Sequence, residues 1–139
     1  GPTVTVIGQL RSFNNKSGQG SRLVISVFAQ TLTPDAGQPL NRIFLSGILC
    51  KQPILRRTPL GREIADLLVA VNRSYGKSDY IPCICWGRNA RYATTFEIGS
   101  HVSVIGRIQS REYVKKLSED EAERRIAYEV SVCKIEELD

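Results

Sequence analysis

The chain has 139 residues, a length that accommodates one domain, or one domain with a fragment of another. Hydrophobic residues make up 42% of it, which is ordinary for a globular protein, and no apolar run approaches the ~20 residues that a membrane-spanning helix needs. The net charge of +5 is uneven, because residues 41–116 carry thirteen Lys/Arg against five Asp/Glu and residues 117–139 carry three against eight. A basic body favours a polyanionic ligand, with a solvated basic surface as the alternative.

The first thirty residues repeat a pattern found near the end of the chain. Val4-Thr-Val-Ile-Gly-Gln-Leu-Arg-Ser12 matches Val102-Ser-Val-Ile-Gly-Arg-Ile-Gln-Ser110, and Ile25-Ser-Val-Phe28 matches Val130-Ser-Val-Cys133. We therefore predict that residues 3–30 form the last two strands of a second, truncated copy of the domain that follows, with a loop over 14–21. Residues 33–39 are rich in turn formers and are predicted to be a linker.

An isolated β-hairpin cannot bury its apolar face, and its edges carry unpaired backbone groups. We expect the hairpin of residues 3–30 either to dock on the sheet edge of residues 41–139 or to pair with its counterpart in a second molecule. The second alternative is favoured, because the linker permits reach. Residues 1–40 are thus assigned to the hairpin and linker, and residues 41–139 to one domain.

Period-two alternation of apolar residues predicts five strands in the larger domain, over 43–50, 64–72, 80–86, 102–113 and 126–135. Residues 56–61, with Pro59 and Gly61, predict a turn, and residues 73–78 a polar loop. Asn89 is expected to cap a short helix that ends at Gly99. The acidic segment at 118–121 has capping-box spacing, so we expect a turn of helix or a disordered loop there.

Three strands, a helix and two further strands are the order of the OB-fold, an all-β, five-stranded Greek-key barrel. A generic β-sandwich is the rival architecture, but it does not explain a single helix in this position.

Aromatic residues close to Arg or Lys recur along the predicted barrel. Tyr80 and Trp86 share one face of the third strand, and Arg107, Arg111 and Tyr113 share one face of the fourth. Flat rings beside fixed positive charge suit unpaired bases on a phosphate chain. The candidate nucleic-acid-binding residues are Tyr75, Tyr80, Trp86, Tyr113, Arg56, Arg57, Arg73, Lys77, Arg88, Arg107, Gln109, Arg111 and Lys115.

Other aromatic residues have structural interpretations. Tyr92 and Phe96 are predicted to be core, Phe44 to pack under the barrel or at a subunit contact, and Tyr128 to lie in the core or at its rim. For Tyr80 and Trp86, packing against an oligomer partner is the alternative to base binding.

The sequence offers no catalytic or metal-binding constellation. The four cysteines form no C-x-x-C pair, and His101 is the only histidine. We expect buried free thiols, no cofactor, no metal and no enzymatic activity.

From Asn41 to about Ile135 the chain resembles the OB domain of bacterial single-stranded DNA-binding proteins and their primosomal relatives. The resemblance rests on Asn41-Arg-Ile-Phe-Leu-Ser-Gly47, on Gly61 leading through an alternating strand to Tyr75, on residues 80–87, and on residues 99–113. It implies that Tyr75, Tyr80, Trp86 and Tyr113 stack on bases. Pro82 departs from the pattern, where a basic residue would be expected, which favours weaker binding.

The resemblance also implies sequence-tolerant binding of single-stranded DNA in replication, recombination or repair, with RNA left open. It implies a homo-oligomer, dimer or tetramer, in the cytoplasm at the nucleoid and not at a membrane. The alternative is an OB-fold adaptor of a primosome-like assembly with weak DNA affinity.

Overall fold

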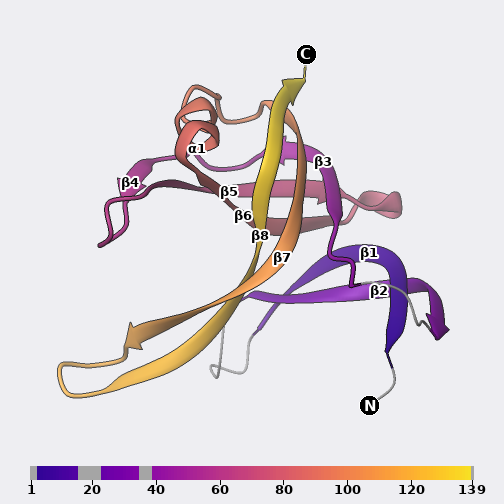
Figure 1. Ribbon diagram of the computed structural model, residues 1–139, viewed down its shortest axis with the longest axis horizontal. Coiled ribbons are helices and arrows are strands. Elements are labelled where there is room, and N and C mark those ends of the chain that lie inside the picture. The colour runs from indigo at the N-terminus through magenta and orange to yellow at the C-terminus, as the bar shows by residue number, and fades with distance from the viewer. Residues whose placement is uncertain (1–2, 16–22, 35–38, 139) are drawn as a thin grey trace.

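The computed structural model describes residues 3–15, 23–34 and 39–138 of the chain. It contains a two-stranded sheet and a six-stranded sheet (Figure 1). The smaller sheet is β1 (Val4–Asn14) and β2 (Leu23–Pro34). The larger one contains β3 (Ile43–Leu49), β4 (Leu55–Arg57), β5 (Glu63–Asn72), β6 (Ser78–Trp86), β7 (His101–Lys116) and β8 (Ala122–Leu138). A 3₁₀ turn (Ser74–Gly76) precedes β6, and α1 (Gly87–Ala93) follows it.

The larger sheet closes into the predicted OB-fold barrel. Its strands follow the order β3-β7-β8-β6-β5-β4, and an additional pairing of β3 with β5 at Leu49 and Val69 closes the ring. Among the described residues, β6 and β8 pair in parallel at two positions only, Cys83 with Val130 and Ile84 with Ser131. β6 and β8 therefore form a short parallel seam, while the other neighbouring strands of the barrel are antiparallel, with β3 and β5 also paired at only two described positions.

β4 corrects the predicted turn at residues 56–61. Arg56 and Arg57 pair in antiparallel fashion with β5, so they belong to a strand. The turn begins at Thr58, whose carbonyl accepts a hydrogen bond from Gly61 N at 2.8 Å. Gly61 adopts the positive φ that such a turn requires.

Alternation along β6 separates the core from the outer face. Its odd-numbered residues, including Ile81, Cys83 and Cys85, are buried with Leu67 and Val69 in the barrel core. Burial raises the pKa of both thiols, that of Cys85 to about 12. All four cysteines are free, as predicted.

Cys133 is exposed, so the prediction of a buried thiol is wrong for this residue. It lies at a register shift in β8, between the partners of Ile105 and Gly106. A bulge adds one residue to a strand, so the side chain at that point leaves the inward alternation.

The helix starts earlier and ends earlier than predicted. It begins at Gly87 directly after Trp86, so Asn89 lies within it and is not its cap. The Thr94 and Thr95 hydroxyls donate to the carbonyls of Arg91 and Tyr92, which ends the helix well before Gly99.

The aromatic residues near the helix differ in burial. Phe96 is core, as predicted, and Tyr92 packs edge-on against it at 4.8 Å between ring centroids. Tyr92 itself stays exposed, since the opposite face of the short helix meets solvent. Phe44 is also exposed on β3, so it does not pack under the barrel; its role in a subunit contact stays a prediction.

β7 and β8 continue beyond the barrel as a long two-stranded arm (Figure 1). The arm ends in a tight connection at the acidic segment, where Leu117 N donates to Glu121 O at 2.9 Å. The prediction of a helical turn at 118–121 is therefore wrong. β7 and β8 pair without interruption from Glu112 with Ile126 to Lys116 with Ala122, so only a short reversal remains at the tip.

β1 and β2 form the predicted amino-terminal hairpin, and their geometry reproduces that of β7 and β8. Each pair has one register shift, at Ile7/Gly8 and at Ile105/Gly106. A Cβ on Gly8 would overlap the Phe28 carbonyl oxygen, and a Cβ on Gly106 would overlap that of Ser131. Glycine is thus required at the same place in both copies, because the opposite backbone approaches closely there.

The second strands correspond with an offset of two residues from the sequence match. Leu10 pairs with Val27, whereas its equivalent Ile108 pairs with Val130. Val27, and not Ile25, therefore takes the place of Val130. The shift is even, so the faces of the strands are unchanged.

The hairpin docks on the barrel through four residues that we call the junction: Ser12, Arg73, Asp79 and Tyr80. Ser12 N donates to Asp79 Oδ1 at 2.8 Å, and Tyr80 N donates to Ser12 Oγ at 2.7 Å. Arg73 donates from Nε and Nη2 to Asp79 at 2.6 Å each. The Arg73 hydrogen bond holds the pKa of Asp79 below its usual value despite the burial of the carboxylate.

The hairpin contacts the barrel, but not at a sheet edge as one of the two alternatives predicted, because in the described chain β1 and β2 pair only with each other. Pairing between molecules stays a prediction. Thr33 and Pro34, expected in the linker, are the last residues of β2. The remainder of the predicted hairpin loop and linker, at 16–21 and 35–38, lies outside the described residues.

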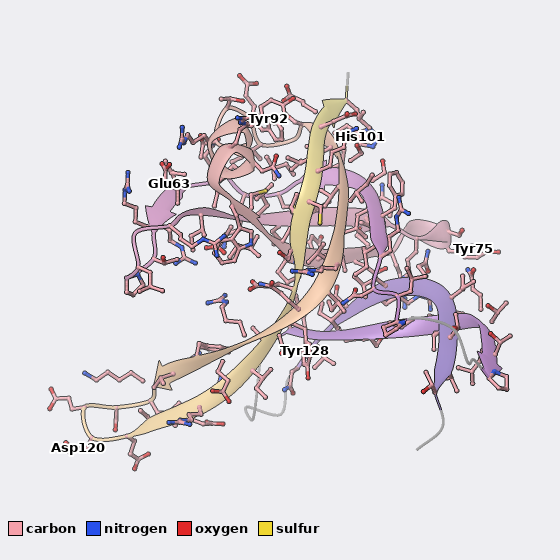
Figure 2. All side chains as sticks on the ribbon, viewed as in Figure 1. Glu63, Tyr75, Tyr92, His101, Asp120 and Tyr128 are labelled. Carbon is pink, nitrogen blue, oxygen red and sulfur yellow. The ribbon has the colours of Figure 1, made fainter. Side chains whose placement is uncertain are left out.

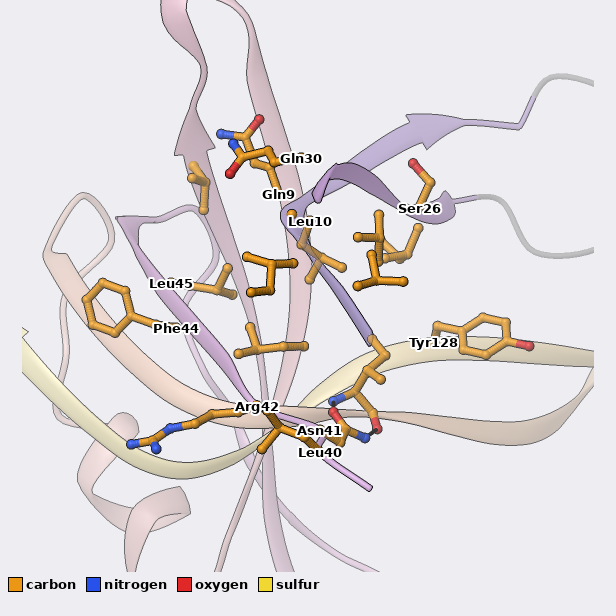
Figure 3. Close-up of a pocket in the computed structure, with 18 residues that line it drawn as sticks. Gln9, Leu10, Ser26, Gln30, Leu40, Asn41, Arg42, Phe44, Leu45 and Tyr128 are labelled. Carbon is orange, nitrogen blue, oxygen red and sulfur yellow. Dashed lines mark hydrogen bonds between the residues drawn. The ribbon is translucent and has the colours of Figure 1, made fainter. Parts of the chain in front are cut away.

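A cleft of about 840 Å³ separates the hairpin from the barrel mouth (Figure 3). Leu10 and Ile25 of the hairpin pack against the barrel core, but the cleft beside them stays open. Leu45 and Tyr128 line its barrel side, so Tyr128 lies at the rim of the barrel. The hairpin is therefore held mainly at the junction.

Candidate nucleic-acid interface

Trp86 is the centre of the surface that we call the outer barrel face, formed by the outward side chains of β5, β6, β7 and β8. The indole Nε1 donates to Ser131 Oγ on β8 at 3.3 Å, which fixes the ring against the sheet. The Arg62 guanidinium lies 4.4 Å from the ring centroid. Arg107 is paired in register with Ser131, so it lies on β7 opposite the residue that holds the ring. A partly exposed indole beside a cation can stack on an aromatic ligand that carries negative charge.

A second group of charges on this face is internally compensated. Glu129 is buried on β8, and its Oε1 accepts from Gln109 Nε2 at 3.1 Å and from Arg111 Nε at 3.0 Å. The hydrogen bond to Glu129 raises the pKa of Arg111 above its usual value. Gln109 and Arg111 are thus positioned on the predicted face, but the charge of Arg111 is already neutralised.

A shallow groove of about 480 Å³ crosses the same face between β4, β5 and β7. Arg56 pairs with Asp66 there at 2.6 Å, and both side chains remain accessible to solvent. Pro82 also lines the groove, which places it on the outer barrel face, as predicted. The groove thus lies beside the Glu129–Arg111 pair and carries little net charge.

Tyr80 and Tyr113 lie on the outer faces of β6 and β7, as predicted. Tyr80 is 46% exposed, and Tyr113 is half-buried opposite Arg125 of β8. The Arg125 Nε is the one buried side-chain polar atom among the described residues without a hydrogen-bond partner. Tyr113 therefore marks where the face passes onto the arm, next to Lys115.

Tyr75 stands apart at the tip of the turn between β5 and β6 (Figure 2). The side chain is fully exposed, and its backbone adopts φ +72°, a left-handed conformation that is uncommon for an aromatic residue. Lys77 follows it, and its carbonyl accepts from Arg73 N at 2.7 Å. An exposed ring on a strained backbone is more typical of a binding residue than of a packing residue.

The remaining candidates divide by location. Arg57 donates to the Gly61 carbonyl at 3.3 Å in the β4–β5 turn, and Arg88 is exposed on α1. Arg73 is committed to Asp79 in the junction. The structure therefore brings Trp86, Tyr80, Arg107, Gln109, Arg111 and Tyr113 onto one face, and leaves Tyr75, Lys77, Arg88 and Lys115 at its edges.

Three residues of this face were missed by sequence reasoning. Arg62 lies over Trp86, Ser131 holds the indole, and Glu129 neutralises Arg111. Strand alternation could have placed Ser131 and Glu129 on the outward side of β8. Their partners depend on the pairing of β8 with β6 and β7, which the sequence does not specify.

The parts of the chain that the structure describes contain no group of three or more His, Cys, Asp or Glu residues that could hold a metal ion. Within the same residues, no helix has the length and apolar character needed to cross a membrane. His101 lies at the start of β7, where its ring hydrogen-bonds with Ser46 Oγ at 3.0 Å.

The model of the single-strand binding protein family matches residues 40–138, so the chain belongs to this family. Single-stranded DNA-binding protein 2 of Listeria innocua is 41% identical over 81 residues, which cover 53% of this chain and 51% of that protein. Single-stranded DNA-binding protein A of Bacillus subtilis is also 41% identical over 81 residues, covering 53% and 47%. The chain thus spans about half the length of these curated relatives.

The crystal structure of the wild-type single-stranded DNA-binding protein from Thermus aquaticus has the same fold, with a TM-score of 0.81 at 24% identity. The superposition covers 100% of this chain and 60% of that one. The match therefore includes the amino-terminal hairpin, which lies outside the residues matched by the family model.

Proposed function

We propose that the chain binds single-stranded DNA with little sequence preference, by stacking bases on aromatic side chains of the outer barrel face. The observation that supports this most is the setting of Trp86. Its ring is held by Ser131, remains accessible, and has the Arg62 guanidinium over it, while Arg107 lies on β7 opposite Ser131. Unpaired bases offer a π-face at every nucleotide, so this arrangement does not depend on sequence.

Displacing Arg62 from the indole would cost little, because an exposed cation–π contact contributes only ~0.5–1 kcal/mol. A base that replaces the guanidinium on the ring would gain ~1–3 kcal/mol from stacking. The released Arg62 can then contact a phosphate. Trp86 and Arg62 thus form a site that opens when a strand arrives.

The compensated arginines limit the electrostatic contribution. Arg56, Arg73 and Arg111 each have a carboxylate partner, whereas Arg62 and Arg107 have none among the described residues. We therefore expect a salt dependence smaller than the count of basic residues indicates, with each neutralised phosphate contributing about −0.7 to the log–log slope.

The names of the relatives support DNA over RNA as the ligand. A role in replication, recombination or repair, a dimeric or tetrameric assembly and a cytoplasmic location at the nucleoid belong to the same proposal. The adaptor hypothesis differs from it in predicting weak, salt-insensitive contact with nucleic acid.

The experiment is a titration of the intrinsic fluorescence of Trp86, the only tryptophan, with an oligothymidine at two salt concentrations. We expect quenching, and affinity that falls as salt rises. Tyr80→Ala should weaken binding, whereas Tyr92→Ala is the matched control, because the two side chains are 46% and 45% exposed on different surfaces. Equal affinity for duplex DNA, or no response to salt, would contradict the proposal.

A further inference from the structure

The amino-terminal hairpin has a second face that points away from the barrel. Leu10 and Ser12 are turned toward the barrel, so the alternate residues of β1 face outward with their partners on β2. We call Arg11, Phe13, Val24 and Phe28 the hairpin face. Phe13 is 50% exposed and Phe28 is 54% exposed. Two large rings are thus presented to solvent on a short sheet.

Each of these rings has an arginine beside it. The Arg11 guanidinium carbon lies 3.9 Å from the Phe28 centroid, and Gln9 Oε1 accepts from Arg11 Nε at 3.0 Å. The Arg73 guanidinium carbon lies 5.5 Å from the Phe13 centroid. Along residues 3–34 the sequence has three basic residues and no Asp or Glu. The hairpin face therefore combines exposed rings with the positive charge of Arg11, as Trp86 and Arg62 do on the barrel, whereas Arg73 is paired with Asp79.

The hairpin face is continuous with the binding surface of the barrel at the junction. Phe13 follows Ser12, which bonds to the backbone of Tyr80. Arg73, beside Phe13, begins the turn that carries Tyr75 and Lys77. A strand that leaves the barrel past Tyr80 or Tyr75 would meet Phe13 next.

We propose that the hairpin face is a second contact for the same single strand, in which Phe13 and Phe28 stack on bases and Arg11 contacts phosphate. The inference rests on the proposed function of the outer barrel face. Charge complementarity and continuity with that face support a polyanion as the occupant. A second copy of the chain, which carries the same positive charge, is the other occupant that the test must distinguish.

The test compares two labelled oligothymidines by fluorescence anisotropy, one of about 8 and one of about 30 nucleotides, since an OB domain occupies ~4–16 nucleotides. Phe13→Ala and Phe28→Ala should each weaken binding of the long strand about fivefold or more, and change binding of the short strand by less than about twofold. Phe13→Tyr, which keeps a ring, should retain the affinity. Arg11→Gln should lower the salt slope for the long strand only.

Leu32→Ala is the control, because Leu32 is exposed on the same hairpin without a neighbouring arginine among the described contacts. Trp86→Ala should weaken both strands; if it weakens neither, the proposed function fails, whatever the hairpin variants do. If Trp86→Ala weakens both and the hairpin variants affect the two lengths equally or not at all, the hairpin inference is wrong. A fall in oligomer mass by light scattering in Phe13→Ala, with long-strand affinity unchanged, would assign the face to a second copy.

Discussion

The two hairpins β1–β2 and β7–β8 share a sequence pattern and a backbone geometry, yet they differ in what surrounds them. Both have the register shift after the isoleucine and the closely approached glycine, Gly8 or Gly106. β7 and β8 pair additionally with β3 and β6, whereas β1 and β2 pair only with each other in the described chain. Local sequence thus determines the hairpin and its bulge, and neighbouring strands determine whether it is buried.

Equivalent valines show the difference most directly. Val102 and Val104 are fully buried in the barrel core, while Val4 and Val6, at the same places in the pattern, are 48% and 44% exposed. The same side chain on the same pleat contributes to the core in one copy and faces solvent in the other. Hydrophobic alternation therefore reports the capacity for burial, and burial itself depends on the rest of the sheet.

The largest difference between the two hairpins is expected when the two equivalent glycines are substituted. Gly106→Ala should lower the free energy of unfolding by about 3 kcal/mol, because its Cβ would overlap the Ser131 carbonyl inside the barrel. Gly8→Ala should change the main unfolding transition by less than about 0.5 kcal/mol, and remove amide protection only in β1 and β2. Denaturant unfolding and hydrogen exchange measure the two effects. An equal loss in both variants would show that hairpin and barrel unfold as one unit.

The junction is the next target, because it joins the two regions. Asp79→Asn should cost roughly 2 kcal/mol, less than the ~3–5 kcal/mol of a fully buried pair, since Arg73 remains 17% exposed. It should also release the hairpin to solvent in hydrogen exchange. Asp66→Asn, which breaks the exposed pair with Arg56, is the control, with a loss below about 1 kcal/mol.

Because of the same carboxylate, the free energy of unfolding is expected to fall at acidic pH. Arg73 holds the pKa of Asp79 below its usual 3.8, so the junction contributes fully above about pH 3.8 and is lost as the pH falls through the lowered pKa. Urea unfolding as a function of pH should show this loss in the native chain and a flatter acid limb in Asp79→Asn. Identical pH profiles of the two proteins would show that protonation of Asp79 does not affect stability.

Arg111 on β7 and Phe13 on β1 are at equivalent positions, and substituting them should have smaller effects on stability. Arg111→Ala should lower stability by about 1 kcal/mol, because it leaves the Glu129 carboxylate with Gln109 alone. The double variant Arg111→Ala with Glu129→Gln should recover most of the loss. Phe13→Ala should leave stability nearly unchanged, since its ring is exposed. Chemical denaturation decides; a loss in Phe13→Ala as large as in Arg111→Ala would make that ring structural.

A small change in stability, in the stabilising direction, is expected at Tyr75, on the turn beside the junction. Asparagine tolerates the left-handed backbone better than tyrosine, so Tyr75→Asn should leave the melting temperature equal or raise stability by up to ~1 kcal/mol. Affinity for single-stranded DNA should nevertheless fall, because the exposed ring is lost. Unchanged affinity would exclude Tyr75 from the interface, and Lys77→Ala would then test the remaining charge of the turn.

The sequence predicted the strands other than β4, their outward faces and the family fold, because each depends on alternation and on turn residues close in the chain. It did not predict which arginines are neutralised. Arg111 meets Glu129 only through the register of β7 with β8, and the hairpin meets Asp79 only after the barrel has closed. Arg62 likewise reaches Trp86 from the turn after β4, which brings together residues distant in the sequence.

The cysteines differ in burial, so the reactivity of their thiols reports when the barrel opens. Cys83 and Cys85 are enclosed and their raised pKa values keep them as thiols at neutral pH, whereas Cys133 faces solvent. An alkylating reagent will therefore modify Cys133 at once and the two enclosed sulfurs only when the strands separate. Cys83 lies in the short parallel seam with β8, so the rate at which it is modified measures how often that seam opens. Bound DNA that bridges β6 and β8 should lower the modification rate of Cys83.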